Sequence, residues 1–425
     1  MATTLFTNAR LAGVDGPQDL LAVDGRFAAI GPDLAGRAAL LAADGAPVRT
    51  VDLAGRLVTA PFCDTHLHLD YVFTAGKPGA TNGTGTLFEG IQRWGETKAD
   101  LTVADVKERA MAAVAKEVRH GVQYIRTHAD VTDPKLTSLR ALLELRDELR
   151  DTVTIQVVAM PQEGMYAYPG GRDLVEEGLK LGADCVGGIP HYEPCREMGE
   201  RSMHDVVDLA VRYGRMIDVH CDETDDPMSR YVELLAALAH AEGIGAMTCA
   251  SHTCSLGSVD DSYFFHLLKL LRASRLNFAC APTENLYLQG RQDTYPKRRG
   301  ITRVKELTDA GVNVSLGQDS MCDPWYPLGN GNMMVILDYL LHVGQMMTRA
   351  EIDRALDFAT VNGAVTMMLD DYGLAVGNPA NFIVLDAASP FEAVYERADV
   401  LASYRAGEPL FTATTTVESP LEWMA

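Results

Sequence analysis

The feature that most constrains the fold is a series of short apolar runs, which recur between residues 56 and 319 at a spacing of about thirty residues. Each run is nearly continuous in apolar residues, as expected for strands buried on both faces. Segments with a helical pattern separate the runs, for example residues 104–120 and 139–151. The eight runs are RLVTAPF, VQYIRTH, TVTIQVVAM, DCVGGIP, MIDVHCDE, AMTCASH, LNFACAP and VNVSLGQD.

Eight strands that alternate with helices predict an α/β fold, a (β/α)8 barrel of the TIM type over residues 59–376. A doubly wound sheet is the alternative, but it does not require eight evenly spaced units. Residues 1–58 and 377–425 consist instead of short strand-and-turn segments, such as LLAVDGRFAAIG and NFIVLDA. We expect these two remote segments to pair into a small β-sandwich domain.

Composition and charge narrow the choice of partners. Of the 425 residues 47% are apolar, and the formal net charge is −21. So acidic a chain is a poor partner for nucleic acid or for an anionic membrane. No apolar run approaches the ~20 residues that span a bilayer, and the first residues do not resemble a secretory signal. The eight cysteines are scattered without a CxxC pair, so we expect a cytoplasmic protein with reduced thiols.

Histidine and aspartate gather at the carboxyl ends of the predicted strands, where barrels of this kind carry their active sites. Strand one ends with His66 and His68, and their spacing of two residues places both on one side of the strand. His220 follows strand five, His252 follows strand six, and Asp319 follows strand eight. Imidazoles and a carboxylate at one barrel mouth predict a site for a divalent metal ion.

Six other histidines carry no such signal. The segment from His191 to Cys195 is similar to the H-x-E…P-C-x-x-C pattern of zinc deaminases, but residue 198, where the second cysteine is needed, is Met198. We therefore discount that pattern. The histidines that lie in helical stretches, and for which we expect a structural role, are His120, His204, His240, His266 and His342.

Longer motifs resemble those of the bacterial cytosine deaminases of the amidohydrolase superfamily, over essentially the whole chain. The similar segments are HLH, GTLFEGIQRW, PQEG, VHCDE, SHT, LQGRQDTYPKRRGITRVKE and DPWYPLGNGNM. The resemblance implies a homo-oligomer and one metal ion per active site, Fe²⁺ or Zn²⁺, with the ligands His66, His68, His220 and Asp319. Binuclear relatives have a carboxylated lysine after strand four, and residues 188–191 contain no lysine.

The resemblance also implies roles in catalysis. His252 and Asp319 are expected to flank the metal-activated water and accept its proton, and Glu223 to protonate ring nitrogen N3 of the substrate. Gln162 offers a donor and an acceptor on one amide, which suits the O2 and N1 edge of a pyrimidinone. The expected apolar walls against the ring are Trp325 and Leu87.

One position departs from the resemblance in a way that bears on the substrate. Cytosine deaminases of this family have the sequence GHDD where this chain has Gly317-Gln318-Asp319-Ser320. Replacing the second aspartate by Ser320 removes a charge and opens space beside carbon C5 of the base. A difference of one methyl-sized group typically shifts specificity by about 1–3 kcal/mol. We therefore expect 5-methylcytosine as substrate, with cytosine as a secondary one.

Other functions remain as alternatives. The enzyme could prefer plain cytosine, or act on another cyclic amidine such as isocytosine, isoguanine or creatinine. A metal-binding scaffold without catalysis is disfavoured by Glu223, which has no structural use beside an open metal position. A ring-opening dihydropyrimidinase is disfavoured by the missing lysine. We expect Gln318 to support Asp319, while the sequence does not decide whether Met321 or Cys322 lines the C5 pocket.

Overall fold

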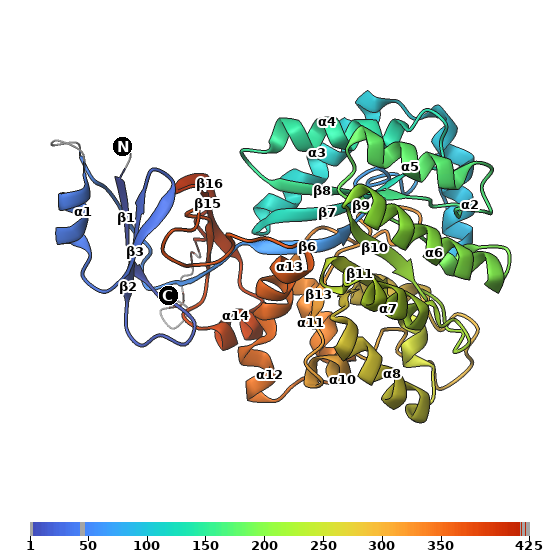
Figure 1. Ribbon diagram of the computed structural model, residues 1–425. Coiled ribbons are helices and arrows are strands. Elements are labelled where there is room, and N and C mark those ends of the chain that lie inside the picture. The colour runs from blue at the N-terminus through green and yellow to red at the C-terminus, as the bar shows by residue number, and fades with distance from the viewer. Residues whose placement is uncertain (1–2, 43–46, 417, 419–420, 422–425) are drawn as a thin grey trace. The chain divides into compact units, whose positions relative to one another are not determined.

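A computed structural model describes residues 3–42, 47–416, 418 and 421. The chain forms two compact units (Figure 1). One unit comprises residues 1–61, 118–121 and 371–425, and the other comprises residues 62–117 and 122–370. Among the described residues, no helix is both long and apolar enough to cross a membrane.

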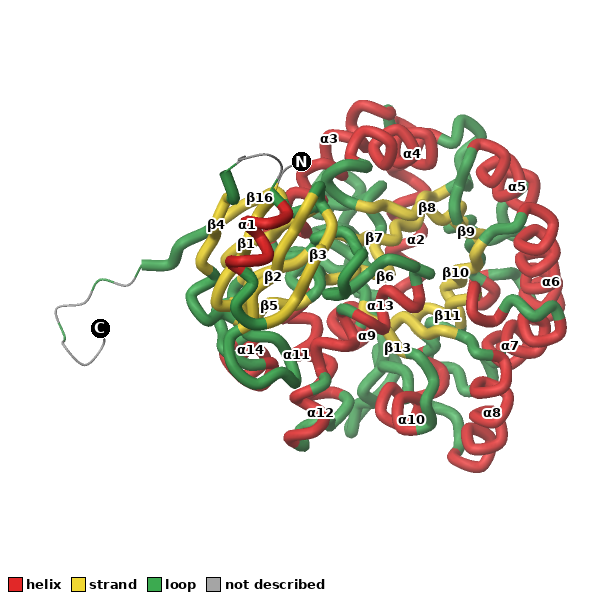
Figure 2. The backbone as a smooth tube through the Cα atoms, turned by 60° about the vertical axis from the view of Figure 1, so that its left-hand side comes forward, coloured by secondary structure: helices red, strands yellow, loops and turns green. Residues whose placement is uncertain are grey.

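The larger unit is a barrel of parallel strands surrounded by helices, as Figure 2 shows. Its eight-stranded sheet has the order β13-β12-β11-β10-β9-β8-β7-β6, so neighbours in sequence are neighbours in space. The strands are β6 (Phe62–Leu67), β7 (Val122–Asp130), β8 (Thr154–Met160), β9 (Cys185–Val186), β10 (Met216–Cys221), β11 (Thr248–His252), β12 (Asn277–Cys280) and β13 (Val314–Leu316).

The first and last strands meet and close the barrel. Asp319 N donates to His66 O over 2.7 Å, and His68 N donates to Asp319 O over 3.0 Å. Leu67 and Asp319 form a parallel bridge. Three residues that the sequence singled out therefore lie on the seam where the barrel closes.

Helices connect successive strands, as the alternating pattern predicts. Those longer than ten residues are α2 (Leu87–Thr97), α3 (Val103–Arg119), α4 (Thr137–Leu149), α5 (Gly171–Leu181), α6 (Arg196–Tyr213), α7 (Tyr231–Ala241), α8 (Asp261–Ser274) and α11 (Met333–Val343). The shorter ones are α9 (Pro282–Leu288), α10 (Val304–Asp309), α12 (Arg349–Asp353) and α13 (Val361–Thr366). The prediction of a TIM-type barrel is confirmed.

The smaller unit contains two four-stranded sheets. One has the order β3-β2-β1-β4, from β1 (Thr3–Ala9), β2 (Gln18–Val23), β3 (Arg26–Gly31) and β4 (Arg49–Asp52). The other has the order β16-β15-β14-β5, from β5 (Leu57–Thr59), β14 (Phe382–Leu385), β15 (Val400–Arg405) and β16 (Glu408–Thr412). The smaller unit also contains the short helices α1 (Ala35–Leu41) and α14 (Pro390–Glu396).

Both ends of the chain build the core of this unit. The Phe6 ring packs edge-on against Phe382 and Tyr404, with centroids 4.8 and 4.9 Å apart, and Phe382 stacks on Tyr404 at 4.7 Å. The expected small domain built from both termini is confirmed. One predicted strand is wrong: RLVTAPF is not the first barrel strand, because its central residues form β5 and pair with β14. Pro61, which lacks an N–H to donate, separates β5 from β6.

Candidate active site

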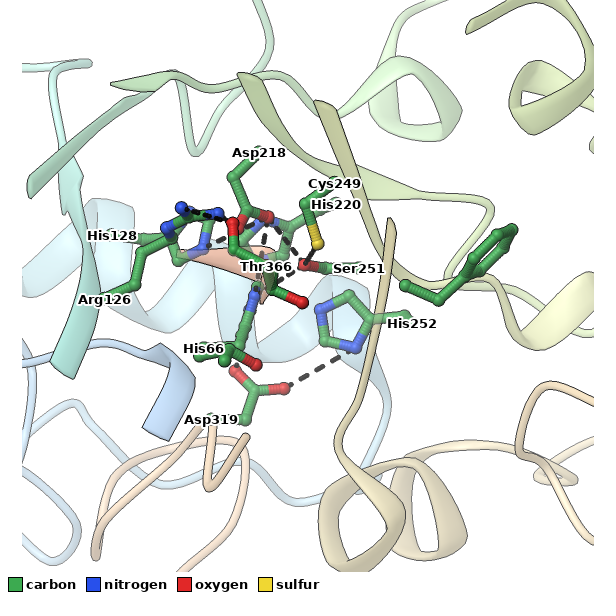
Figure 3. Close-up of polar contacts among 12 residues, drawn as sticks. His66, Arg126, His128, Asp218, His220, Cys249, Ser251, His252, Asp319 and Thr366 are labelled. Carbon is green, nitrogen blue, oxygen red and sulfur yellow. Dashed lines mark hydrogen bonds and ion pairs between the residues drawn. The ribbon is translucent and has the colours of Figure 1, made fainter. Parts of the chain in front are cut away.

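The residues predicted to bind a metal converge at the carboxyl ends of their strands. Nε2 of His66 and Nε2 of His68 each lie 3.5 Å from Oδ1 of Asp319. Nε2 of His68 also lies 2.9 Å from Nε2 of His220 on β10. Figure 3 shows that His66 and His252 point toward Asp319. Barrel closure therefore gathers residues that lie up to 253 positions apart in the sequence.

Burial determines the charge state of this cluster. Desolvation lowers the pKa of His66 to about 4 and lowers the pKa values of His68 and His220 well below their usual range. Desolvation also raises the pKa of the Asp319 carboxyl to about 6, while His252 opposes this rise. The imidazoles are consequently uncharged at neutral pH, which is the form that binds a metal ion.

The donor atoms fit a divalent cation. Nε2 of His66 and Oδ2 of Asp319 are buried without a hydrogen-bond partner, which is costly unless another group satisfies them. One donor atom from each of His66, His220, His252 and Asp319 lies within 4.8 Å of the others. Nε2 of His68 lies close to His220 and Asp319, so five side chains surround the candidate metal position. Iron and zinc both accept imidazole and carboxylate ligands.

Glu223 and His252 lie together beside this point. Nδ1 of His252 is 3.6 Å from Oε1 of Glu223 and 3.6 Å from Oδ2 of Asp319. The amide nitrogen of Asn285 lies 3.3 Å from Glu223 Oε1 and 3.2 Å from His252 Nδ1, and thereby holds the two side chains in place. Desolvation, followed by repulsion from Asp319, raises the pKa of Glu223 well above its usual value. Desolvation lowers the pKa of His252 to about 3.

These charge states suit acid–base chemistry. A carboxyl that keeps its proton at neutral pH can act as a general acid, and a neutral imidazole can accept a proton. The sequence predicts Glu223 as the proton donor and His252, with Asp319, as the proton acceptor, and Glu223 lies 3.6 Å from His252.

The backbone at these strand ends is strained. His252 and Asp319 both have φ near +68°, and Asp222, just before Glu223, has φ +53°. Residues other than glycine seldom adopt this left-handed region, and such strain costs of order 1–3 kcal/mol per residue. The turn at Asp222 is held because its carboxylate accepts hydrogen bonds from Ser229 Oγ, Tyr231 N and Val232 N over 2.6, 3.0 and 2.8 Å.

The predicted walls of the substrate pocket pack around one aromatic stack. Trp325 Nε1 donates to the Leu87 carbonyl over 3.2 Å. The Trp325 ring lies 4.4 Å from Tyr71, and Tyr71 stacks on His68 at 4.5 Å and 16°. The close approach of α2 requires Gly90, since a Cβ there would come within 2.3 Å of the Trp325 ring. Tyr71 was not predicted, although it follows the HLHLD segment directly.

Gln162 follows β8 and is buried, and its amide oxygen has no hydrogen-bond partner. The neighbouring Glu163 forms an ion pair with Lys98, whose ammonium group also donates to Asp130 Oδ2 over 2.8 Å. Trp94 Nε1 donates to the same Asp130 oxygen over 2.8 Å. These contacts tie the loop after β8 to α2 and β7, and so hold the backbone that carries Gln162.

Ser320 is buried, and two acidic side chains near its hydroxyl, Glu284 and Asp323, were not predicted as part of the site. Burial raises the pKa values of both carboxyls, that of Asp323 to about 7, and the nearby Ser320 hydroxyl opposes this rise. Asp323 also accepts hydrogen bonds from Trp325 N and Tyr326 N over 3.0 and 3.1 Å. The surroundings of Ser320 are therefore more acidic than the sequence predicted.

Gln318 has a different role from the one expected. Its amide oxygen accepts hydrogen bonds from Asn330 N and Gly331 N over 3.2 and 2.9 Å, and its backbone N donates to Asp64 Oδ1 over 3.1 Å. The side chain thus closes the loop 318–331, on which Ser320 and Trp325 lie, instead of contacting the Asp319 carboxylate. Met321 in this loop is buried, whereas Cys322 is partly exposed.

His128 and Asp218 also belong to the site but were not predicted from the sequence. The His128 ring lies 4.1 Å from the His66 ring, near the carboxyl end of β7. The rule that selected His220 and His252 would have found it, had it been applied to strand two. Asp218 precedes His220 by two residues and therefore shares its inward-facing side of β10. The helical histidines His204, His240, His266 and His342 lie on α6, α7, α8 and α11.

Comparison with known proteins identifies the family. The amidohydrolase family matches residues 49–411, which is most of the chain. This chain belongs to the amidohydrolase family. The expected assignment to that family, and to enzymes that remove amino groups from cyclic amidines, is therefore confirmed.

Solved structures resemble this amidohydrolase along nearly its whole length. A 5-methylcytosine deaminase from Klebsiella pneumoniae, liganded with 5-fluorocytosine, is 47% identical with a TM-score of 0.93, and the match covers 98% of this chain and 99% of that one. An N-isopropylammelide isopropylaminohydrolase from Burkholderia multivorans is 27% identical with a TM-score of 0.81, covering 96% and 98%. Among sequence relatives, a pterin deaminase from Rhizobium rhizogenes is 26% identical over 348 residues, which cover 80% of this chain and 78% of that protein.

Proposed function

We propose that this amidohydrolase hydrolyses 5-methylcytosine to thymine and ammonia, and that cytosine is a poorer substrate. The observation that carries the proposal is Ser320, a small residue directly after Asp319. The similarity to the Klebsiella 5-methylcytosine deaminase supports it, because that similarity extends over 98% of the chain.

The metal site has a defined set of candidate ligands. His66, His68, His220 and Asp319 would hold one Fe²⁺ or Zn²⁺ ion, since their donor atoms converge and the imidazoles are neutral. Bound there, the cation would supply a Lewis acid that makes water acidic enough to ionise near neutral pH.

Proton transfer is assigned to Glu223 and His252. His252 is neutral and lies beside Asp319, so it would accept the proton of the attacking water. Glu223 holds its proton because it is buried, and it would donate that proton to N3 of the base. Carbon C4 then becomes electrophilic, the C4–O bond forms and the C4–N bond breaks. The amino group gains the proton that His252 took from the water and departs as ammonia, and the C4 hydroxyl passes its proton to Glu223 as the carbonyl forms.

The remaining residues hold the base. Gln162 would present its unpaired amide oxygen to the N1–H of the base and its amide N–H to O2. Trp325, which Leu87 and Tyr71 fix in position, would pack against the ring. Together these contacts would orient C4 toward the metal and C5 toward Ser320.

Ser320 would form the pocket for the 5-methyl group. An aspartate at this position would place one more carboxyl near Asp319, Glu284 and Asp323, and the Asp319 charge already adds to the rise in pKa that burial causes in the other two. A serine hydroxyl avoids that repulsion and occupies less volume. Burial of a methyl group contributes about 0.8 kcal/mol, and a good or poor fit changes specificity by about 10–200-fold.

The test is the ratio of kcat/KM for 5-methylcytosine to kcat/KM for cytosine, measured by ammonia release from the metal-loaded enzyme. We expect a ratio of about ten or more in the parent protein, in line with one well-fitted methyl group. Ser320→Thr adds one methyl group to the pocket, so it should reverse the preference while cytosine is still deaminated. Ser320→Ala keeps the pocket open and should preserve the preference.

The variants also separate size from charge. Ser320→Asp should abolish the preference, and it should weaken the activity toward both bases because of the added carboxyl. A parent enzyme that favours cytosine, with a ratio unchanged in Ser320→Thr, would mean that position 320 does not select the substrate.

A preference for plain cytosine is the second candidate. Glu284 and Asp323 favour it, because they keep acidic groups beside position 320 even though the aspartate is replaced. The same ratio distinguishes the two candidates.

A further inference from the structure

A second layer of polar side chains lies one step deeper in the barrel, toward the amino ends of the strands. Asp218 on β10 and Arg126 on β7 each precede an inward-facing histidine by two residues, and the side chain of Ser251 on β11, which pairs with His220, reaches Asp218. All three side chains are buried. In Figure 3 their polar groups lie above the His66 ring, whereas Asp319 lies below it.

These side chains form a continuous chain of hydrogen bonds that ends at a predicted metal ligand. Arg126 donates from its guanidinium to Asp218 Oδ2 over 2.9 Å. Ser251 Oγ donates to the other oxygen, Asp218 Oδ1, over 2.6 Å. Nδ1 of His66 lies 2.9 Å from Ser251 Oγ.

The direction of these bonds determines the proton on His66. Arg126 has only donors, so Asp218 must accept. Ser251 donates its single hydroxyl hydrogen to Asp218. Ser251 Oγ can then only accept from His66, which requires a proton on Nδ1. Nε2 is left with a free lone pair, and this is the atom that is buried without a partner and faces Asp319.

The same layer could be mistaken for a second metal site. One donor atom from each of His66, His128 and Asp218 lies within 4.8 Å of the others. The Arg126 guanidinium already bonds Asp218, however, and it donates further hydrogen bonds to Gln156 Oε1 and the Thr366 carbonyl. A fixed positive charge at this point repels a cation, so the layer fits an orienting role.

We propose that Arg126, Asp218 and Ser251 are positioning residues, which hold His66 as the Nδ1–H tautomer and so present its Nε2 to the metal ion. This inference rests on the proposed metal site and adds a group that selects the tautomer of one ligand. Loss of a hydrogen-bond partner of a metal-binding histidine typically lowers metal affinity by about 10–100-fold.

Metal affinity of the full-length protein is the direct readout. The protein is stripped with a chelator and titrated with Zn²⁺ in competition with a chromogenic chelator, and its cobalt form is compared by visible absorption. Ser251→Ala removes the acceptor for His66 Nδ1–H and should weaken Zn²⁺ binding by about 10–100-fold. Ser251→Thr keeps the hydroxyl and should restore the affinity.

Ser315→Ala is the matched control. Ser315 is an equally buried serine on a barrel strand, and its Oγ bonds Thr65, Thr366 and the Phe278 carbonyl instead of a histidine. Both alanine variants should lose some thermal stability, but only Ser251→Ala should lose metal affinity. Equal affinities in the parent, Ser251→Ala and Ser315→Ala would overturn the proposal.

Asp218→Asn tests the direction of the chain without changing its shape. Arg126, which has only donors, can bond only the amide oxygen of the new Asn. The Asn NH2 group would then donate to Ser251, and Ser251 would donate to His66 Nδ1. This reversal forces the proton onto Nε2 and blocks coordination, so Zn²⁺ affinity should fall at least as far as in Ser251→Ala. Asp218→Asn with parental affinity and an unchanged cobalt spectrum would contradict the assignment, even if Ser251→Ala failed to fold.

These outcomes are independent of the substrate. A parent protein that binds Zn²⁺ tightly but releases no ammonia from either base would contradict the proposed function alone. Tight binding in the parent and in all variants would contradict only the orienting role.

Discussion

At the scale of single residues, the acid role of Glu223 can be separated from its packing. Glu223→Gln keeps an oxygen for the Asn285 amide but removes the proton for N3. We expect kcat for the preferred base to fall by about 10²–10⁴-fold, while Zn²⁺ content and the melting temperature stay close to those of the parent. The control is Glu193→Gln, a buried carboxyl whose contacts are the backbone N–H groups of residues 165–167. A Glu223→Gln enzyme with parental kcat would remove Glu223 from the mechanism.

At the scale of elements, the loop 318–331 carries the groups expected to select the substrate, and Gln318 closes it. Gln318→Leu has a similar size but leaves the N–H groups of Asn330 and Gly331 without this acceptor, which for the buried Gly331 costs about 1–3 kcal/mol. KM for the preferred base should rise by more than kcat falls, and the amides of residues 329–331 should exchange hydrogen faster. Gln318→Glu keeps the acceptor and should restore the slow hydrogen exchange of these amides. If exchange accelerated but KM did not change, the loop would not control binding.

The elements also show what the sequence could predict. Strands buried on both faces leave a clear apolar pattern, so the barrel and the metal-binding strand ends were predictable. Side chains that neutralise one another inside the barrel leave no such pattern: Arg126 and Asp218 lie 92 positions apart, and only folding brings them within 2.9 Å. Glu284 was missed for the same reason, since its proximity to Ser320 depends on how α9 and the loop 318–331 meet.

At the scale of the molecule, the metal site lies on the seam that closes the barrel, where β6 and the end of β13 meet through Asp319. A metal ion held by His66, His68 and Asp319 would tie the first strand to the last. Ligand at 100 times its dissociation constant stabilises a fold by about 2.7 kcal/mol, so chelation should lower the melting temperature. The loss should also be local: hydrogen exchange should accelerate in β6 and β13 more than in β8 and β9, which contribute none of the proposed ligands. Uniform acceleration over all eight strands, or no change at the seam, would mean that the cation does not hold the barrel closed.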